Sequence, residues 1–291
     1  MLKKIELTNN EVYTYREIEN DQPKLLLIHG NMTSSQHYDV LIEALKNSFH
    51  IIAPDLRGFG GSTYKHEISS LKDFSEDIYL FMNALDIPKA NIAGWSTGGG
   101  IAMQLAIDHP EYVKKLILIE SVGIKGYPIY KKNDQGQPIV EEPLLTKAEI
   151  AKDVVQVLPI LNAYAQKDKE TLKQIWDALI YVNGQPDDSQ YRIYLEDMLT
   201  QRNLVDVDYA LTRFNISEKN NGVVDGTGEI NNITQETLIF QGTNDLVVPE
   251  AMGDGIYEAL GDQAKLVKGD WGHSPLIDAL DVLKKEITEF I

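Results

Sequence analysis

The pentapeptide G-W-S-T-G at residues 94–98 has the spacing of a turn that presents a nucleophilic serine. An apolar run at 90–95 precedes it, and a helical pattern at 98–109 follows. A sharp turn between a strand and a helix can hold a serine Oγ above the edge of a sheet, and its glycines are needed where neighbouring backbones leave no room for a Cβ. Ser96 is therefore the candidate nucleophile, and a glycine-rich turn with an exposed serine is the alternative.

A serine hydroxyl attacks a carbonyl only when a base removes its proton and a carboxylate orients that base. Asp245 follows the apolar run 236–241 and a glycine turn, and His273 lies beyond the run 264–267. The order of serine, acid and histidine is the one that such a sheet-based site requires. Ser96, Asp245 and His273 are thus the predicted catalytic triad. Three nearby carboxylates remain alternatives to Asp245, namely Asp254, Asp262 and Asp270.

The oxyanion that forms during such an attack needs two preorganised N–H donors. One is expected from Thr97, the residue after the nucleophile, and the other from the loop that begins at His29. Gly30 lets this loop fold back toward the serine, so the Asn31 N–H is the expected second donor, with the Met32 N–H as second choice. His29 is not placed to serve as the base, and we expect it to brace the loop with side-chain hydrogen bonds.

A second glycine-rich turn, D-L-R-G-F-G-G-S, occupies residues 55–62. Glycine-rich turns before helices can bind phosphate, but the G-x-x-x-x-G-K-[ST] and G-x-G-x-x-G patterns are absent. The favoured interpretation is a buried network between Asp55 and Arg57 that shapes the floor of the site. Metal signatures such as H-E-x-x-H are also absent, and no metal or organic cofactor is expected.

Alternating strands and helices must position these residues. Continuous apolar runs stopped by turn residues are typical of strands buried on both faces. This pattern predicts an α/β fold with a mostly parallel sheet and helices on both faces. The predicted strands are 5–7, 12–18, 24–30, 50–55, 90–95, 113–120, 236–241 and 264–267. The predicted helices are 70–85, 98–109, a helical stretch between the last two strands and a last one that reaches residue 291.

The alternation of strand and helix patterns stops between residues 124 and 232. A stretch rich in Gly, Pro and Tyr, with a possible hairpin at 130–136, leads into helical patterns without a strand between them. Thr146 and Glu149 have the spacing of a capping box. We predict a core domain of residues 1–123 and 233–291 and a helical cap of residues 124–232. The aromatic side chains of this insertion either line an apolar pocket or form its core, and both interpretations stay open.

Composition narrows the possible partners. The chain has 291 residues, no cysteine and a formal net charge of −17. The negative charge argues against nucleic acid and anionic membranes as partners, and the lack of cysteine excludes disulfides, thiolate metal sites and a cysteine nucleophile. No apolar run approaches the roughly 20 residues that span a bilayer, and the N-terminus lacks the apolar stretch of a signal peptide. A cytoplasmic location is expected, and no pattern indicates an oligomeric state.

Taken together, the motifs resemble the α/β-hydrolase superfamily, in its lidded esterase/lipase-like branch. The resemblance implies that Ser96 is the nucleophile, His273 the base and Asp245 the residue that orients it. Serine at residue 96 sets aside the epoxide hydrolases and haloalkane dehalogenases, which carry aspartate there, and a proline usual in cofactor-free perhydrolases is missing from the first loop. The matching stretches are residues 29–32, 55–62, 94–98, 242–249 and 272–275.

The resemblance implies a serine hydrolase of the carboxylesterase type (EC 3.1.1). Its expected substrate is a small apolar ester whose acid is small or medium in size, and cleavage is expected to pass through an acyl-enzyme on Ser96. Two alternatives stay open. One is hydrolysis of a C–C bond in a diketone ring-fission product, which the acidic character of the insertion does not encourage. The other is a ligand-sensing regulator that keeps the triad.

Overall fold

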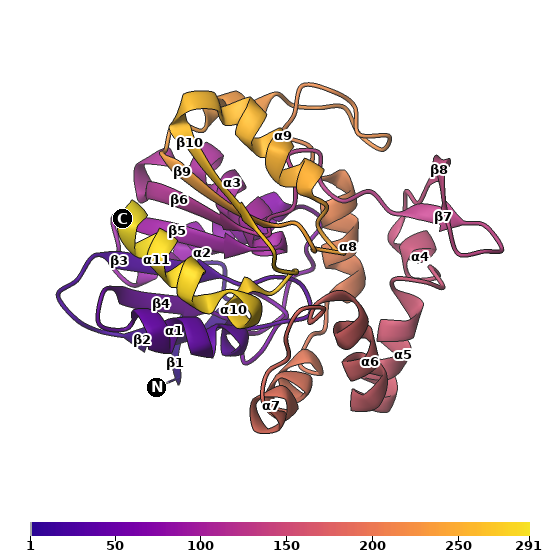
Figure 1. Cartoon of the computed structure of the whole chain (residues 1–291), viewed down its shortest axis with the longest axis horizontal. Helices are drawn as coiled ribbons and strands as arrows, with labels where there is room; N and C mark the ends of the chain where they lie inside the picture. The colour runs from indigo at the N-terminus through magenta and orange to yellow at the C-terminus, as the bar shows by residue number, and fades with distance from the viewer. Residues whose placement is uncertain (1) are drawn as a thin grey trace.

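A single large sheet forms the centre of the computed structural model, which describes residues 2–291 (Figure 1). Within these residues the sheet has eight strands, and the pairs from β4 to β10 are parallel, whereas β1 and β2 join antiparallel at one edge. The predicted fold class is confirmed. In spatial order the strands are β1 (Leu2–Glu6), β2 (Val12–Ile18), β4 (His50–Pro54), β3 (Lys24–Ile28), β5 (Ala90–Trp95), β6 (Val113–Ile119), β9 (Thr237–Gly242) and β10 (Ala264–Gly269).

Helices cover both faces of the sheet, which is why the central strands are apolar throughout. Alternate side chains of β3 enter two different apolar clusters, Leu26 and Ile28 on one face and Leu25 and Leu27 on the other. The first cluster also contains side chains of α2, α3 and α9, and the second contains side chains of α1 and α11. The helices of the core, with the short α10 included, are α1 (Asp39–Leu45), α2 (Leu71–Ala84), α3 (Thr97–Asp108), α9 (Glu250–Leu260), α10 (Pro275–Asp278) and α11 (Leu280–Phe290).

The predicted elements agree with the observed ones within a few residues, with two differences. β1 starts at Leu2 rather than Ile5, because its pairing with β2 continues back to a register of Leu2 with Arg16. Helix α1 was not predicted, since it has only seven residues and follows a turn of 3₁₀ helix, η1 (Ser35–Tyr38). The remaining 3₁₀ helices are η2 (Pro110–Tyr112), η3 (Glu229–Asn232) and η4 (Gly261–Gln263).

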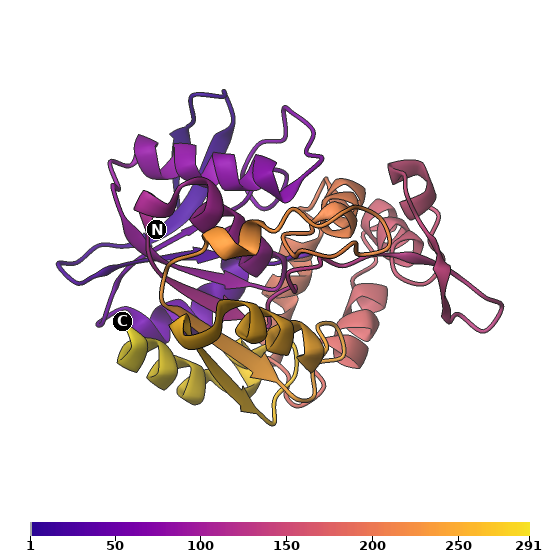
Figure 2. The same ribbon diagram turned by 90° about the horizontal axis from the view of Figure 1, so that it is seen from above.

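The chain leaves the sheet after β6 and returns to it with β9, which lies beside β6 and parallel to it. Between them it forms a small two-stranded sheet and five helices, which lie to one side of the large sheet in both views (Figures 1 and 2). The capping box at Thr146 and Glu149 is present at the start of α4. These elements are β7 (Tyr130–Lys132), β8 (Pro138–Pro143), α4 (Lys147–Ile150), α5 (Leu158–Gln166), α6 (Lys169–Leu179), α7 (Asp188–Met198) and α8 (Leu204–Arg213).

The last part of the segment 124–232 packs on the core. η3 contacts α3 and α9, and Ile216 and Ile230 belong to the same apolar cluster as the helices on that face of the sheet. Below, residues 124–213 are called the cap, and the part of the candidate site that they contact is called the cap side. The division into core and cap domains stays a prediction.

None of the helices between residues 2 and 291 has both the length and the apolar character needed to cross a lipid bilayer.

Candidate active site

Ser96 occupies a strained turn between β5 and α3. Its φ and ψ angles are +56° and −120°. Residues with a Cβ rarely adopt this backbone conformation, and it persists only where the surroundings enforce it. The crossing is tight, because a Cβ on Gly94 would collide with the backbone of Gly98, and a Cβ on Gly98 would collide with the Ile28 carbonyl. The Ser96 N–H donates to the Ile119 carbonyl at 2.9 Å, which ties the turn to the end of β6.

Asp245 and His273 are brought together at the ends of β9 and β10. The His273 Nδ1 lies 2.7 Å from Asp245 Oδ2, while Asp245 Oδ1 accepts the N–H groups of Val247 and Val248 at 2.7 and 2.8 Å. Burial by itself would raise the pKa of Asp245, but attraction and hydrogen bonding to His273 and the Val248 N–H lower it below its usual value. Asp245 is therefore an ionised carboxylate fixed from both sides.

Two of the alternative carboxylates have other partners. Asp254 forms an ion pair with Lys268, and Asp270 accepts a hydrogen bond from Asn244. Within residues 2–291 no hydrogen bond joins Asp254, Asp262 or Asp270 to the His273 ring.

Ser96 and His273 are linked through the neighbouring Trp95. The Trp95 Nε1 donates to the His273 carbonyl at 2.8 Å, and the two rings lie 5.9 Å apart. Across the described part of the chain, residues 2–291, no hydrogen bond runs from Ser96 Oγ to the His273 imidazole. Such bonds are often long before substrate binds and shorten in the reacting complex.

The loop after β3 approaches the serine closely. A Cβ on Gly30 would lie only 3.0 Å from the Ser96 Cβ, so glycine permits the approach. The Met32 N–H donates to Asn31 Oδ1 at 3.0 Å and to Gln201 Oε1 at 3.1 Å. By contrast, the N–H groups of Asn31 and Thr97 donate to no acceptor within residues 2–291, which leaves these two donors available.

His29 braces this loop, as the sequence predicts. Its Nδ1 bonds the Gly30 carbonyl at 2.8 Å and its Nε2 accepts the Leu56 N–H at 2.9 Å. Burial lowers its pKa, although the Gly30 carbonyl partly offsets this effect. A neutral, fully bonded imidazole holds the loop and is not available as a base.

The predicted network between Asp55 and Arg57 is wrong. Arg57 instead forms two hydrogen bonds of 2.7 Å with Asp77 of α2. Asp55 accepts the N–H groups of Ser35 and Gly61, at 3.0 and 2.9 Å. The two side chains leave the turn in different directions, so each finds its partner in another segment of the chain.

Two polar residues of the cap side contact the loop of Asn31. Gln201 donates from Nε2 to Asn31 Oδ1 at 2.7 Å, and its Oε1 accepts from Tyr164 Oη at 3.0 Å. Asp208 of α8 accepts from Asn31 Nδ2 at 3.1 Å. Burial raises the pKa of Asp208 to about 7, although the Asn31 hydrogen bond favours its ionised form.

A second buried carboxyl group, that of Glu120, lies close to Asp245. Glu120 follows the last residue of β6, and its side chain is fully buried. Sequence analysis missed Glu120, Gln201 and Asp208. Only Glu120 carries a local signal, because it is a charged residue directly after a buried strand, at the same edge of the sheet as the triad.

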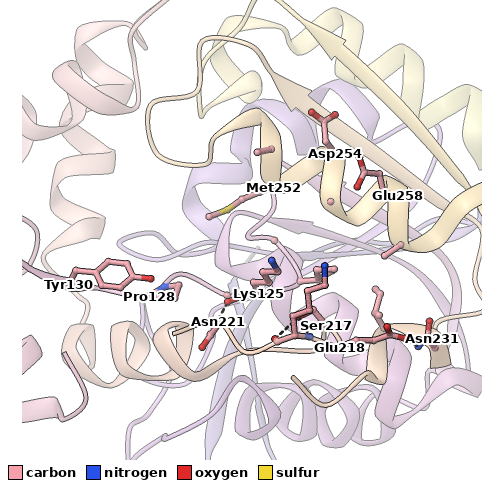
Figure 3. A pocket seen from close by; sticks show the side chains of 18 residues that line it. Lys125, Pro128, Tyr130, Ser217, Glu218, Asn221, Asn231, Met252, Asp254 and Glu258 are labelled. Atoms are coloured by element: carbon pink, nitrogen blue, oxygen red, sulfur yellow. Dashed lines mark hydrogen bonds between the residues drawn. The ribbon is translucent and has the colours of Figure 1, made fainter. Parts of the chain in front are cut away.

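A groove of about 950 Å³ lies away from the triad, between residues 123–130, residues 217–231 and α9 (Figure 3). Its lining includes Lys125, Asp254 and Glu258, so charges of both signs face it, and none of the triad residues lines it. This mixture of charges points to no single class of ligand.

The family model that describes the alpha/beta hydrolase fold matches residues 23–280. A pimeloyl-[acyl-carrier protein] methyl ester esterase of Nitrosomonas europaea is 24% identical over 264 residues, 90% of this chain and 92% of that protein. A 2-hydroxymuconate semialdehyde hydrolase of Pseudomonas sp. (strain CF600) is 38% identical over 109 residues, which are 36% of this chain and 38% of that protein. This match and those to uncharacterised mycobacterial proteins span little more than a third of the relatives' own length.

Among solved structures, an esterase from Exiguobacterium antarcticum superposes with a TM-score of 0.75 over 100% of this chain and 99% of that one. The two sequences are 19% identical. At this identity the likeness supports the fold alone.

Proposed function

The chain belongs to the α/β-hydrolase fold family, and we propose that it is a serine hydrolase acting on an uncharged carboxylic ester of a small or medium apolar acid. The observation that carries the proposal is the 2.7 Å contact between His273 Nδ1 and Asp245 at the sheet edge that also holds the strained Ser96 turn. The match to a methyl ester esterase over 90% of the chain supports the same chemistry.

In the proposed acylation step, His273 Nε2 removes the Ser96 proton while Oγ attacks the carbonyl carbon. The N–H groups of Thr97 and Asn31 stabilise the resulting oxyanion. The C–O bond to the alcohol then breaks, and His273 returns its proton to the leaving oxygen. Ionised Asp245 holds the imidazole in the required tautomer and stabilises its positive charge.

Deacylation repeats the sequence with water as the nucleophile. His273 accepts a proton from water, and the hydroxide attacks the acyl-enzyme carbonyl. When the tetrahedral intermediate collapses, the carboxylic acid leaves and Ser96 Oγ regains its proton from His273. No other reactant is needed for this balance.

The charges around the site favour an uncharged substrate. Asp208 contacts Asn31 from the cap side, and within residues 2–291 it forms no ion pair with a lysine or arginine. The carboxylates of Asp245 and Asp208 both raise the pKa of Tyr127, after burial as the main cause, so this tyrosine lies in the field of both. A substrate carboxylate would be repelled there.

Hydrolysis of a C–C bond is the second candidate. The 38% identical segment shared with a 2-hydroxymuconate semialdehyde hydrolase favours it. Turnover of a ring-fission dicarboxylate that exceeds turnover of every simple ester would place this candidate first.

The first experiment is intact-mass labelling with a fluorophosphonate, on the native protein and on Ser96→Ala, followed by p-nitrophenyl esters of increasing chain length. One adduct on the native protein and none on Ser96→Ala is the expected result. If the native protein takes up no label, Ser96 is not activated, and the result favours the ligand-sensing alternative over the serine hydrolase.

A further inference from the structure

Glu120 is a buried titratable group that the proposed mechanism does not use. Its side chain is 0% exposed, and its φ angle of +42° is unusual for a residue with a Cβ. The Glu120 N–H donates to the Phe240 carbonyl at 2.9 Å, so the residue still belongs to the edge between β6 and β9. Strained residues of this kind persist where surrounding contacts hold them in place, often at functional sites.

The side chain of Glu120 connects the two loops that carry Asp245 and His273. Its Oε2 accepts the Gly242 N–H at 2.9 Å, just before the loop of Asp245. Its Oε1 accepts from Trp271 Nε1 at 2.8 Å, two residues before His273. The Trp271 ring stacks on Phe240 at 4.3 Å between ring centres, which fixes the direction of its N–H.

The charge of Glu120 is not balanced by a cation. Within residues 2–291 it forms no ion pair with lysine, arginine or histidine, and the charged group that acts on it is the Asp245 carboxylate, whose repulsion and hydrogen bonding raise the pKa of Glu120 after burial. A hydrogen bond between two carboxyl groups requires that one of them keeps a proton.

The position of that proton follows from the surroundings. Burial, followed by repulsion from Asp245, raises the pKa of Glu120 well above its usual value, whereas His273 lowers the pKa of Asp245. The proton therefore resides on Glu120. The other titratable group facing this pair is Tyr127, whose pKa is raised by burial and by Asp245.

We propose that Glu120 is a positioning residue that, as a neutral carboxylic acid, donates a hydrogen bond to Asp245 and holds the loops of Asp245 and His273 in register. This inference rests on the proposed function, since it assigns Glu120 its role through the proposed triad. Within residues 2–291 no hydrogen bond joins Glu120 to Ser96, so Glu120 acts through Asp245 and His273.

Replacement by glutamine tests the charge of Glu120, because Glu120→Gln keeps an N–H donor toward Asp245 and one carbonyl acceptor, and loses only acceptance at one of the two oxygens that now accept N–H groups. If Glu120 is neutral, the acidic limb of the kcat/KM profile stays within about 0.3 pH units of the native one. If Glu120 is instead ionised, its replacement removes a negative charge near the imidazolium. The acidic limb of the kcat/KM profile would then move to a pH about one unit lower, and this result would overturn the proposal.

Removal of the donor tests the positioning role. In Glu120→Leu we expect kcat to fall about 10- to 100-fold with KM changed less than threefold, since the loops lose their common anchor. The acidic limb should move upward, because Asp245 without its donor stabilises the imidazolium more strongly. Glu258→Gln, an exposed residue of α9 that lines the groove in Figure 3, is the matched control and should match the native protein. Native kcat in Glu120→Leu would contradict the role.

An infrared measurement covers the case in which Glu120→Leu does not fold, and it needs no activity. The native protein should show the carbonyl band of a protonated carboxyl group at pH 9, where Asp208 is ionised. The band should vanish in Glu120→Gln and persist in Glu258→Gln. A band that survives in Glu120→Gln, or its absence from the native protein, overturns the inference. A native protein that has the band but takes up no fluorophosphonate would instead refute the proposed function.

Discussion

The two sides of the candidate site are built differently. On the core side, Ser96, Asp245, His273 and Glu120 all lie just beyond strands of one sheet, and backbone hydrogen bonds between strands fix their spacing. On the cap side, Gln201 and Asp208 reach the loop of Asn31 only through side-chain contacts. From this difference we propose that the sheet carries the bond-breaking chemistry and that the cap selects the substrate.

The cap side nevertheless contacts the part of the core that carries the predicted oxyanion donor Asn31. Asp197 of α7 accepts from Ser34 at 2.6 Å and bonds His37 at 3.1 Å, and both core residues follow Asn31 by a few positions. The Tyr194 hydroxyl of α7 donates to Asp39 in the same stretch. The cap is thus attached to the core through the loop that the reaction would use, so changes in the cap can reach the chemistry.

The largest effect is expected on the core side. His273→Ala removes the base, and ester hydrolysis should fall roughly a thousandfold to a millionfold, as for other enzymes whose residues act as one unit. Steady-state rates with a p-nitrophenyl ester measure the loss. Asp254→Asn is the control, because this alternative carboxylate pairs with Lys268, and it should keep activity within about twofold. Activity of His273→Ala within about twofold of the native rate would remove His273 from the mechanism.

Asp208 should have the next largest effect, on stability rather than on the chemical step. Its pKa of about 7 in the folded protein exceeds the usual 3.8, so the folded state binds the proton more tightly and stability is lost as pH rises toward 7. Asn at this position does not titrate. The stability advantage of Asp208→Asn should therefore grow by about 2–3 kcal/mol between pH 5 and pH 8, since one pKa unit is about 1.4 kcal/mol.

Urea unfolding of both proteins at these two pH values measures this difference. An advantage that is constant with pH would mean that Asp208 is already ionised at pH 5. The same variant should also accept anionic esters better than the native protein, through a lower KM.

A cap-side change should reach the core through Asn31. Gln201→Leu removes the bonds to Asn31 Oδ1 and to the Met32 N–H, so the loop loses its support. We expect kcat to fall about 10-fold with little change in KM, because the oxyanion donor is displaced rather than removed. Gln185→Leu, at an exposed position before α7, is the control. If both glutamine variants keep native kcat, the two sides of the site are independent.

The smallest effect is expected far from both sides. Val140 in β8 is 63% exposed on the hairpin that extends furthest from the sheet in Figure 1. Val140→Ser should change the free energy of unfolding by no more than about 0.5 kcal/mol and leave kcat/KM unchanged. A larger loss of activity would show that the hairpin takes part in the function, which would contradict the assignment of the chemistry to the core side.

Predictions from the sequence were most accurate where the pattern is local. Strand ends at Trp95 and Gly242 follow from apolar runs and glycine turns, and they place Ser96 and Asp245 at one sheet edge. The Arg57 interaction was predicted incorrectly because Asp55 is close in sequence, whereas the actual partner, Asp77, lies on a helix 20 residues away.

The sequence by itself determined the sheet and the order of Ser96, Asp245 and His273 along the chain, because apolar periodicity and glycine turns are properties of short segments. Only the tertiary structure revealed the surroundings of these residues. Glu120 meets Trp271 across 151 positions, Gln201 meets Asn31 across 170, and Asp208 meets Asn31 across 177. Contacts of this range leave no periodic signal in either segment. They exist only because packing of the sheet and the cap brings distant side chains within hydrogen-bonding distance.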